Sequence, residues 1–209
     1  MAADVLPISN LAYLEAAQVL GRAFKDDPLV AAVLRGQPPD ERVNHMTALF
    51  TAGLLVCVRR GSPLAVMERD KTLAAAIIYP PGTYPLPLHE QVRVALKTIG
   101  GAGLYGLGRA LRAFGDLAKH HPKDNHYYLQ FIGVEPALQG KGMGSTILSH
   151  LVQRADDDRV GCYLENPNSR NVPLYQRFGF QIVREKPVIG VPVWFMWRPP
   201  IQAQVDKRF

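Results

Sequence analysis

Apolar residues recur at helical spacing in two segments near the N-terminus. The first pattern runs from Leu11 to Phe24, and Ser9 or Asn10 stands where a helix cap is expected. The second pattern begins after Asp40, which is the predicted cap of its helix. Spacings of three and four residues place these apolar side chains on one face of a helix. Two amphipathic helices are therefore predicted, and the second carries an apolar stripe of Val43, Met46, Phe50, Leu54 and Cys57.

Short apolar runs predict strands on either side of these helices. Residues 5–8 form a run in which Pro7 cannot donate a ladder hydrogen bond, as is typical of an edge strand. Residues 64–68 and 72–79 are rich in alanine and β-branched residues and flank a polar Arg-Asp-Lys sequence. This arrangement predicts a β-hairpin.

Helical patterns return after a proline-rich loop. They cover residues 88–98 and 107–120, and the apolar, glycine-rich segment 99–106 lies between them. Glycine weakens a helix, so we predict a turn between two helices in this segment. A mobile lid is the alternative.

Strands and helices alternate from residue 127 onward. This order predicts an α+β fold of three layers, α/β/α, around a mixed central sheet. No internal repeat or break in composition marks a second domain, so a single domain over residues 1–209 is predicted. The expected elements are a strand at 127–134, a helix at 142–155, a strand at 160–165, a short helix at 172–178, and strands at 180–185 and 193–197.

The composition is that of an ordinary globular protein, with 47% hydrophobic and 20% charged residues. The formal charge of +6 is scattered along the chain, so no nucleic-acid partner is expected. No apolar run reaches the roughly 20 residues of a membrane span, and no signal-peptide pattern opens the sequence. Cys57 and Cys162 are isolated in apolar surroundings, which favours buried thiols and no metal site. We expect a cytoplasmic protein without membrane or metal partners.

A predicted strand runs directly into a loop with three glycines on alternate residues. These are Gly140, Gly142 and Gly144, and an amphipathic helix follows them. Glycines let main-chain N–H groups converge at the positive end of a helix dipole, where an anion such as a phosphate can bind. The loop is therefore the first candidate for a binding site.

Two familiar phosphate loops do not fit this sequence. A Walker A loop requires Ser or Thr after its lysine, but Gly142 follows Lys141. A dinucleotide loop requires the spacing GxGxxG, but Ser145 or Ile147 stands at the last position in the two registers that the glycines allow. A different kind of anion site is therefore expected.

The pattern of Gln139, two residues, Gly142, one residue and Gly144 resembles the acyl-CoA loop of the GNAT family of N-acetyltransferases. A second family signature follows, in which an Asn-led short helix carries Tyr175 and ends at Gly179. Asn171 is a suitable N-cap for this helix, and glycine can adopt the left-handed C-cap conformation. The resemblance covers about residues 62–198. It is greatest to the puromycin N-acetyltransferase type.

The resemblance implies the GNAT fold, with a splayed central sheet, and acetyl-CoA as co-substrate. Residues 1–61 would form the helical substrate side, 62–198 the core with its acyl-CoA site at 127–180, and 199–209 a tail. Tyr175 would be the general acid for the leaving thiolate, and Glu165 the general base, with His121 and His126 as alternatives. The cofactor-binding residues would be Ile132, Gly133, Val134, Gln139, Gly140, Lys141, Gly142, Met143, Gly144, Ser145, Asn168, Asn171 and Tyr175.

The acceptor is expected to be a primary amine of a small molecule, bound by a monomer or homodimer. Transfer to a protein amine, transfer of a larger acyl group, and a non-catalytic acyl-CoA-binding regulator remain alternatives. Asp26 and Asp27 precede Pro28 and are interpreted first as the end of a helix. A cationic amine with an apolar body would suit the candidate acceptor residues, which are Phe24, Asp26, Asp27, Phe50, Tyr79, Tyr84, His89, Glu90 and Tyr105.

Overall fold

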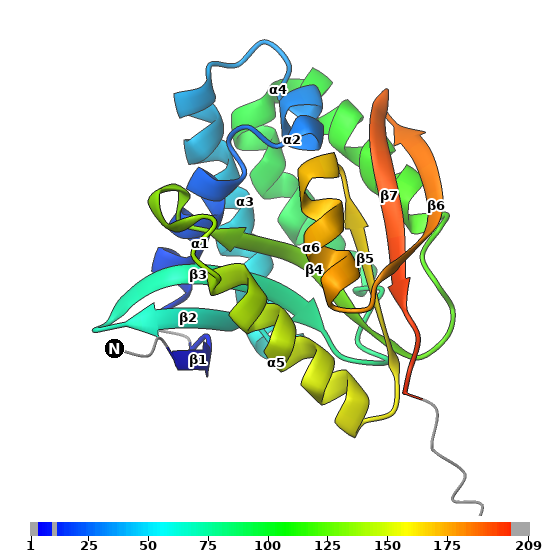
Figure 1. Ribbon diagram of the computed structural model, residues 1–209. Coiled ribbons are helices and arrows are strands. Elements are labelled where there is room, and N and C mark those ends of the chain that lie inside the picture. The colour runs from blue at the N-terminus through cyan, green and yellow to red at the C-terminus, as the bar shows by residue number, and fades with distance from the viewer. Residues whose placement is uncertain (1–3, 10–11, 202–209) are drawn as a thin grey trace, which may run out of the picture.

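The computed structural model describes residues 4–9 and 12–201, apart from the side chains of residues 95–104. The described strands form one sheet in the order β1-β2-β3-β4-β5-β7-β6 (Figure 1). Only the β4–β5 pair among them is parallel. The strands are β1 (Asp4–Pro7), β2 (Leu64–Glu68), β3 (Lys71–Tyr79), β4 (His126–Val134), β5 (Gly161–Asn166), β6 (Gln181–Val188) and β7 (Val191–Arg198).

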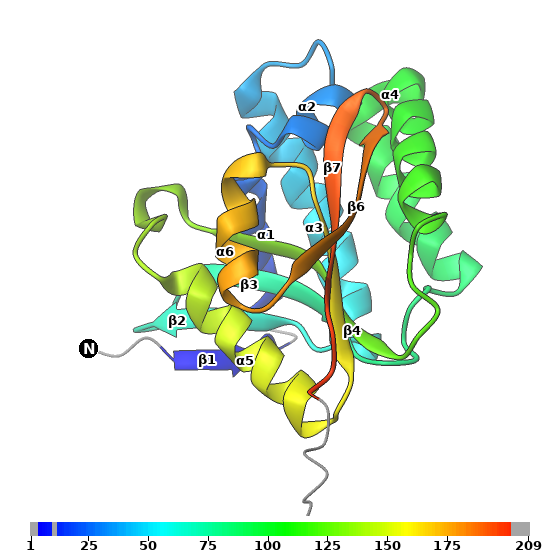
Figure 2. The same ribbon diagram turned by 45° about the vertical axis from the view of Figure 1, so that its right-hand side comes forward.

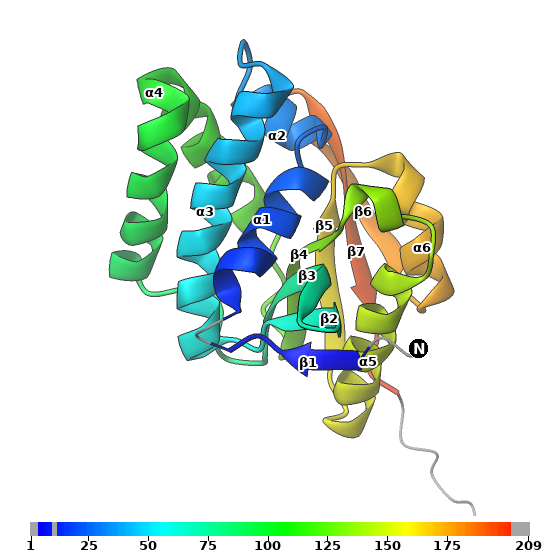
Figure 3. The ribbon, with the colours of Figure 1, turned by 90° about the vertical axis from the view of Figure 1, so that its left-hand side faces the viewer.

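Helices cover both faces of the sheet. Figure 3 shows α1, α3 and α4 on one face and α5 and α6 on the other. Figure 2 shows the β6–β7 hairpin at the edge of the sheet beside α4. The predicted three-layer fold with a mixed sheet is therefore confirmed. The helices are α1 (Tyr13–Ala23), α2 (Pro28–Val33), α3 (Pro39–Arg60), α4 (Leu88–Ala118), α5 (Met143–Asp157) and α6 (Val172–Arg177), with short 3-10 turns η1 (Pro136–Leu138) and η2 (Ser169–Asn171).

The buried apolar residues divide between two cores, one on each face of the sheet. Phe50, Tyr79 and Tyr163 lie fully buried in the core under α1 to α4, whereas Ile147 and Phe180 lie in the core under α5 and α6. Side chains alternate between the two faces along each strand, so neighbouring residues of β5 belong to different cores. Cys57 and Cys162 are both buried as free thiols, as the sequence predicts. No described helix is long and apolar enough to cross a membrane.

The two central strands separate along their length. β4 and β5 pair only from His126 to Tyr128 and from Gly161 to Tyr163. β4 continues to Val134, still paired with β3, and its other edge has no strand partner in the described chain beyond Tyr128. The expected splay of the sheet is therefore present between β4 and β5.

Three predicted helix boundaries are wrong. α4 is one helix of 31 residues that runs through the predicted turn at 99–106. A glycine in a helix costs only about 1 kcal/mol relative to alanine, so tertiary packing can override it. α3 begins at Pro39, with Asp40 in its first turn rather than at its cap. α1 begins at Tyr13 without a side-chain cap, and Asn10, one of its two predicted caps, lies outside the described residues.

Candidate active site

The glycine loop leaves the first turn of α5 open to an anion. Gly140 and Gly142 adopt φ angles of +77° and +88°, which L side chains rarely adopt. Gly142 is the N-cap residue of α5, where no side chain caps the helix and the first turn contains no acidic residue. The main-chain N–H groups of Met143, Gly144 and Ser145 therefore have no helical partner and point toward the loop. These groups, together with the helix dipole, suit a phosphate.

The free edge of β4 provides a second set of main-chain groups. The N–H of Glu135 donates to Leu73 of β3 at 2.9 Å. In an antiparallel pair the hydrogen-bonded residues alternate, so Gly133 pairs with β3, while Ile132 and Val134 direct their N–H and C=O groups into the split. Only the Val134 oxygen accepts a described bond there, from Gln139 Nε2 at 3.3 Å. An extended ligand in the split can therefore pair with Ile132 and Val134.

Gly133 is required by the helix layer. A Cβ atom on this residue would lie 2.9 Å from Ala23 Cβ and 2.9 Å from Leu20 Cδ2. The missing side chain therefore lets α1 pack closely on β4. The family resemblance implies a different reason for this glycine, which is close approach of the thioester to the strand.

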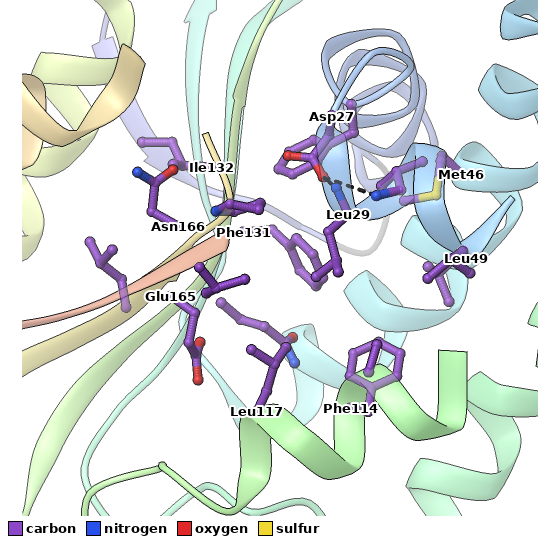
Figure 4. A pocket seen from close by; sticks show the side chains of 18 of the residues that line it. Asp27, Leu29, Met46, Leu49, Phe114, Leu117, Phe131, Ile132, Glu165 and Asn166 are labelled. Atoms are coloured by element: carbon purple, nitrogen blue, oxygen red, sulfur yellow. Dashed lines mark hydrogen bonds between the residues drawn. The ribbon is translucent and has the colours of Figure 1, made fainter. Parts of the chain in front are cut away.

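A cavity of about 150 Å³ adjoins the split. Ile132, Asn171 and Tyr175 line it on the side of the split, and Figure 4 shows Asp27 and Glu165 on opposite sides, with Phe131 between them. The remaining wall is largely apolar. It includes Phe24, Leu29, Met46, Leu49, Phe114 and Leu117, from α1 to α4 and the segments that join them.

Tyr175 is a buried residue of α6. The helix ends as the sequence predicts, with Gly179 in the left-handed conformation at φ +83°. Asn171 is its N-cap residue, but the Asn171 side chain makes no capping bond and lines the cavity instead. Burial, and then the charge of Asp27, raise the pKa of Tyr175 above the usual value of a phenol. The Tyr175 hydroxyl is therefore protonated and available as a donor at neutral pH.

Glu165 has partners inside the protein, because the Tyr128 and Tyr163 hydroxyls lie within hydrogen-bond reach of its carboxylate, which, in addition to their burial, raises their pKa values. Its side chain is 6% exposed and lies 3.9 Å from His121 Nδ1. His126 Nδ1 lies 2.5 Å from the carbonyl oxygen of Asp124 and must donate to it, so His126 Nε2 is an acceptor. His121 Nε2, at 3.2 Å, then donates to His126, and His121 Nδ1 is left to face Glu165.

Asp27 both caps a helix and lines the cavity, whereas the sequence interpretation placed it first at the end of a helix. Its Oδ1 accepts from the N–H groups of Leu29 and Val30 at 2.9 and 3.0 Å and so caps α2, an unpredicted helix. The same carboxylate lines the cavity. Burial raises the pKa of Asp27 to about 6, although the two amides act in the opposite direction. The Asp-Pro pair, which is a helix-start signal, was the sequence feature that could have revealed α2.

The other predicted acceptor residues do not line this cavity, although the second cavity described next shares Leu49, Phe114 and Phe131 with it. Phe50, Tyr79 and Tyr84 line a second cavity of about 670 Å³ beside α3 and α4. The side chain of Asp26 is 72% exposed and Tyr105 is 87% exposed.

Glu90 forms ion pairs with three arginines, and Asn168 caps a 3-10 turn. The Glu90 carboxylate is buried among Arg59, Arg60 and Arg93, at 3.5, 3.9 and 3.1 Å. His89, also a predicted acceptor residue, is an exposed neighbour of that carboxylate at 3.8 Å. Asn168 Oδ1 accepts from the Arg170 N–H at 3.1 Å and caps η2. The described residues contain no group of three or more His, Cys, Asp or Glu that could hold a metal ion.

Residues 61–180 match the model of the acetyltransferase (GNAT) family. An uncharacterized N-acetyltransferase of Schizosaccharomyces pombe is 25% identical over 176 residues, which cover 80% of this chain and 70% of that protein.

Solved structures of acetyltransferases share the fold. One, described as histone acetyltransferase HPA2 and related acetyltransferase from Corynebacterium glutamicum, superposes with a TM-score of 0.72 and 24% identity, over 98% of this chain and 100% of that chain. The PaiA N-acetyltransferase of Thermoplasma acidophilum, solved in complex with coenzyme A, has a TM-score of 0.58 and 10% identity, over 95% and 99% of the two chains.

Proposed function

This chain belongs to the acetyltransferase (GNAT) family and is an acyl-CoA-dependent N-acetyltransferase, and we propose that it transfers the acetyl group of acetyl-CoA to the primary amine of a small molecule with an apolar body. The observation that carries this proposal is the cavity of about 150 Å³, which adjoins the β4–β5 split and joins Tyr175 to two carboxylates. The family acts on amines; the choice of a small, partly apolar one comes from the cavity.

The donor site consists of the glycine loop and the split. Acetyl-CoA supplies an acetyl thioester when it is bound. The open N–H groups at the start of α5 would hold its pyrophosphate, and the free main-chain groups of Ile132 and Val134 would pair with its extended arm. The Val134 N–H is the proposed donor to the acetyl carbonyl oxygen, a kind of contact worth a few kcal/mol in the transition state. Asn168 and Asn171 are also proposed to contact the extended arm of acetyl-CoA.

Two proton transfers complete the reaction. Tyr175 is the proposed general acid, because its buried hydroxyl lines the cavity beside the split and stays protonated at neutral pH. The acceptor ammonium must lose a proton before its nitrogen can attack. Two carboxylates face the cavity, Glu165, which the sequence predicts as the base, and Asp27.

The walls of the cavity favour an ammonium group on an apolar body. Its apolar residues come from α1 to α4, and its carboxylates are the charged groups that reach it from α2 and β5. The similarity to the puromycin type concerns the donor-site motifs, so an aminonucleoside acceptor remains one prediction among others.

The test is release of free thiol from acetyl-CoA with a panel of phenethylamine, spermidine, puromycin and a peptide with a free N-terminus. We expect turnover with phenethylamine above that with spermidine or the peptide. Binding of acetyl-CoA without thiol release for any amine would indicate the regulatory alternative. Succinyl-CoA and longer acyl-CoA donors, assayed with the same amine, test transfer of a larger group.

A further inference from the structure

We propose that Asp27 is the residue that binds the ammonium group of the acceptor and takes up its proton. This inference rests on the proposed acetyl transfer and assigns the base within the same cavity. Glu165 then has a different role, as an internal partner of the buried Tyr128 and Tyr163 hydroxyls.

The contacts of Asp27 leave one oxygen free for a ligand. Oδ1 accepts both amides at the start of α2, and Oδ2 makes no hydrogen bond or ion pair among the described residues. Figure 4 shows the carboxylate at the wall of the cavity, with its bond to the Leu29 N–H. A carboxylate that is capped on one side and open on the other is held rigidly toward whatever enters the cavity.

The two carboxylates differ in their partners. The Glu165 carboxylate lies within hydrogen-bond reach of the buried Tyr128 and Tyr163 hydroxyls, whose pKa values it raises in addition to their burial. Asp27 accepts from two main-chain amides on one oxygen and has no ion pair with a described residue. A cation that enters the cavity therefore finds at Asp27 a carboxylate oxygen without a described partner.

Asp27 also lies on the Tyr175 side of the cavity. Its charge raises the pKa of Tyr175, whereas the charge of Glu165 acts on Tyr84, Tyr128 and Tyr163. The acid that protonates the leaving group and the base that deprotonates the amine must both reach the same acetyl group. Asp27 meets this requirement better than Glu165.

The surroundings of Asp27 bring the pKa of its carboxyl group closer to neutral pH. Burial raises its pKa to about 6, close to the value that suits a general base. The titratable groups around it are Tyr175 of α6, His45 of α3 and the exposed Asp26, with Glu165 across the cavity. His45 Nδ1 is bonded to Gln37 Oε1. An acceptor ammonium beside this carboxylate would favour its ionised form.

The proposed reaction moves one acetyl group from sulfur to nitrogen and releases one proton. The Asp27 carboxylate takes one proton from the ammonium, which leaves a neutral amine. The nitrogen lone pair forms the C–N bond to the acetyl carbon while the C–S bond breaks and its electron pair leaves with sulfur. The Tyr175 hydroxyl donates its proton to that sulfur and recovers one from the nitrogen. Asp27 then releases its proton to solvent, so each turnover liberates one proton.

The test compares Asp27→Asn with Asp26→Asn in the full-length protein, with phenethylamine as the acceptor. Asparagine is as good an N-cap as aspartate, so Asp27→Asn keeps α2 and removes the charge. We expect kcat/KM to fall by about 100-fold or more, the range for loss of a general base, and the rise of kcat/KM with pH through about 6 to disappear. Asp26→Asn, at an exposed neighbouring position, should stay within about 2-fold of wild type and keep this rise.

Two further measurements distinguish loss of the Asp27 charge from damage to the fold. The Kd for acetyl-CoA and the melting temperature of Asp27→Asn should match wild type, and Asp27→Ser, which also caps a helix, should lose activity in the same way. A rise through about pH 6 that persists in Asp27→Asn but vanishes in Glu165→Gln would overturn the proposal. If wild type releases no thiol with any amine of the panel, the proposed function itself fails.

Discussion

Gly142 and Gly144 look equivalent in the sequence, but they should respond oppositely to substitution by alanine. Gly142 has a φ of +88° at the N-cap of α5. Gly144 lies inside the first turn of α5, and a Cβ there would lie 3.6 Å from Val134 Cγ2, an ordinary contact. Gly142→Ala therefore strains the backbone, and Gly144→Ala does not.

The cost follows from the backbone conformation. An L side chain in the left-handed region costs roughly 1–2 kcal/mol. If the loop of Gly142→Ala relaxes to avoid this strain, acetyl-CoA must restore it on binding, and its Kd should rise about 5- to 30-fold. Gly144→Ala keeps its N–H and gains up to about 1 kcal/mol of helix propensity, so its melting temperature should rise by up to about 4 °C with no loss of affinity.

Calorimetric titration with acetyl-CoA and thermal unfolding measure both quantities. Gly190→Ala is the matched control, because Gly190 has a φ of +87° in the β6–β7 turn, with no atom near its missing Cβ. It should lose the same roughly 1–2 kcal/mol of stability while its acetyl-CoA affinity stays unchanged. Equal losses of affinity in Gly142→Ala and Gly144→Ala would refute the reasoning, since the glycines would then act by leaving space for the ligand.

Three further substitutions test the site and its support. Gly133→Ala places a Cβ 2.9 Å from Leu20 Cδ2 and should cost about 1–3 kcal/mol in thermal unfolding, through displacement of α1. Tyr175→Phe should lower kcat about 100-fold or more in the thiol-release assay while the Kd for acetyl-CoA holds, and unchanged turnover would exclude it as the acid. Glu90→Gln removes a buried carboxylate 3.1 Å from Arg93 and should cost roughly 1–3 kcal/mol in denaturant unfolding, without an effect on acetyl-CoA binding.

The conformation of the glycine loop was predictable because it depends on the local sequence. Positive φ angles occur at Gly140 and Gly142 in the glycine loop and at Gly179 at the end of α6. Such positions can be recognised in the sequence, since glycine adopts this backbone conformation without strain. The motif could not reveal that Gly133 serves α1, because that contact joins residues more than a hundred positions apart.

The α4 helix shows the limit of local propensity. Its glycine-rich middle predicts a break, yet the helix continues from Leu88 to Ala118. Helix α4 packs on α3, and its Ala110 and Ala113 are buried there. Burial of an apolar face contributes more than a few glycines remove, and the sequence alone does not show that this face has a partner.

The acceptor side depends on contacts between distant segments, and Asp27 illustrates why its interpretation from sequence was incomplete. Asp26, Asp27 and Pro28 do follow the end of α1, as the sequence predicts, and the same residues start α2. Whether a capping aspartate is only structural depends on what faces its second oxygen. Here that is a cavity shared with Tyr175, from the other face of the sheet. Because one oxygen fixes the helix and the other is free, Asp27→Asn separates the two roles without a loss of the cap.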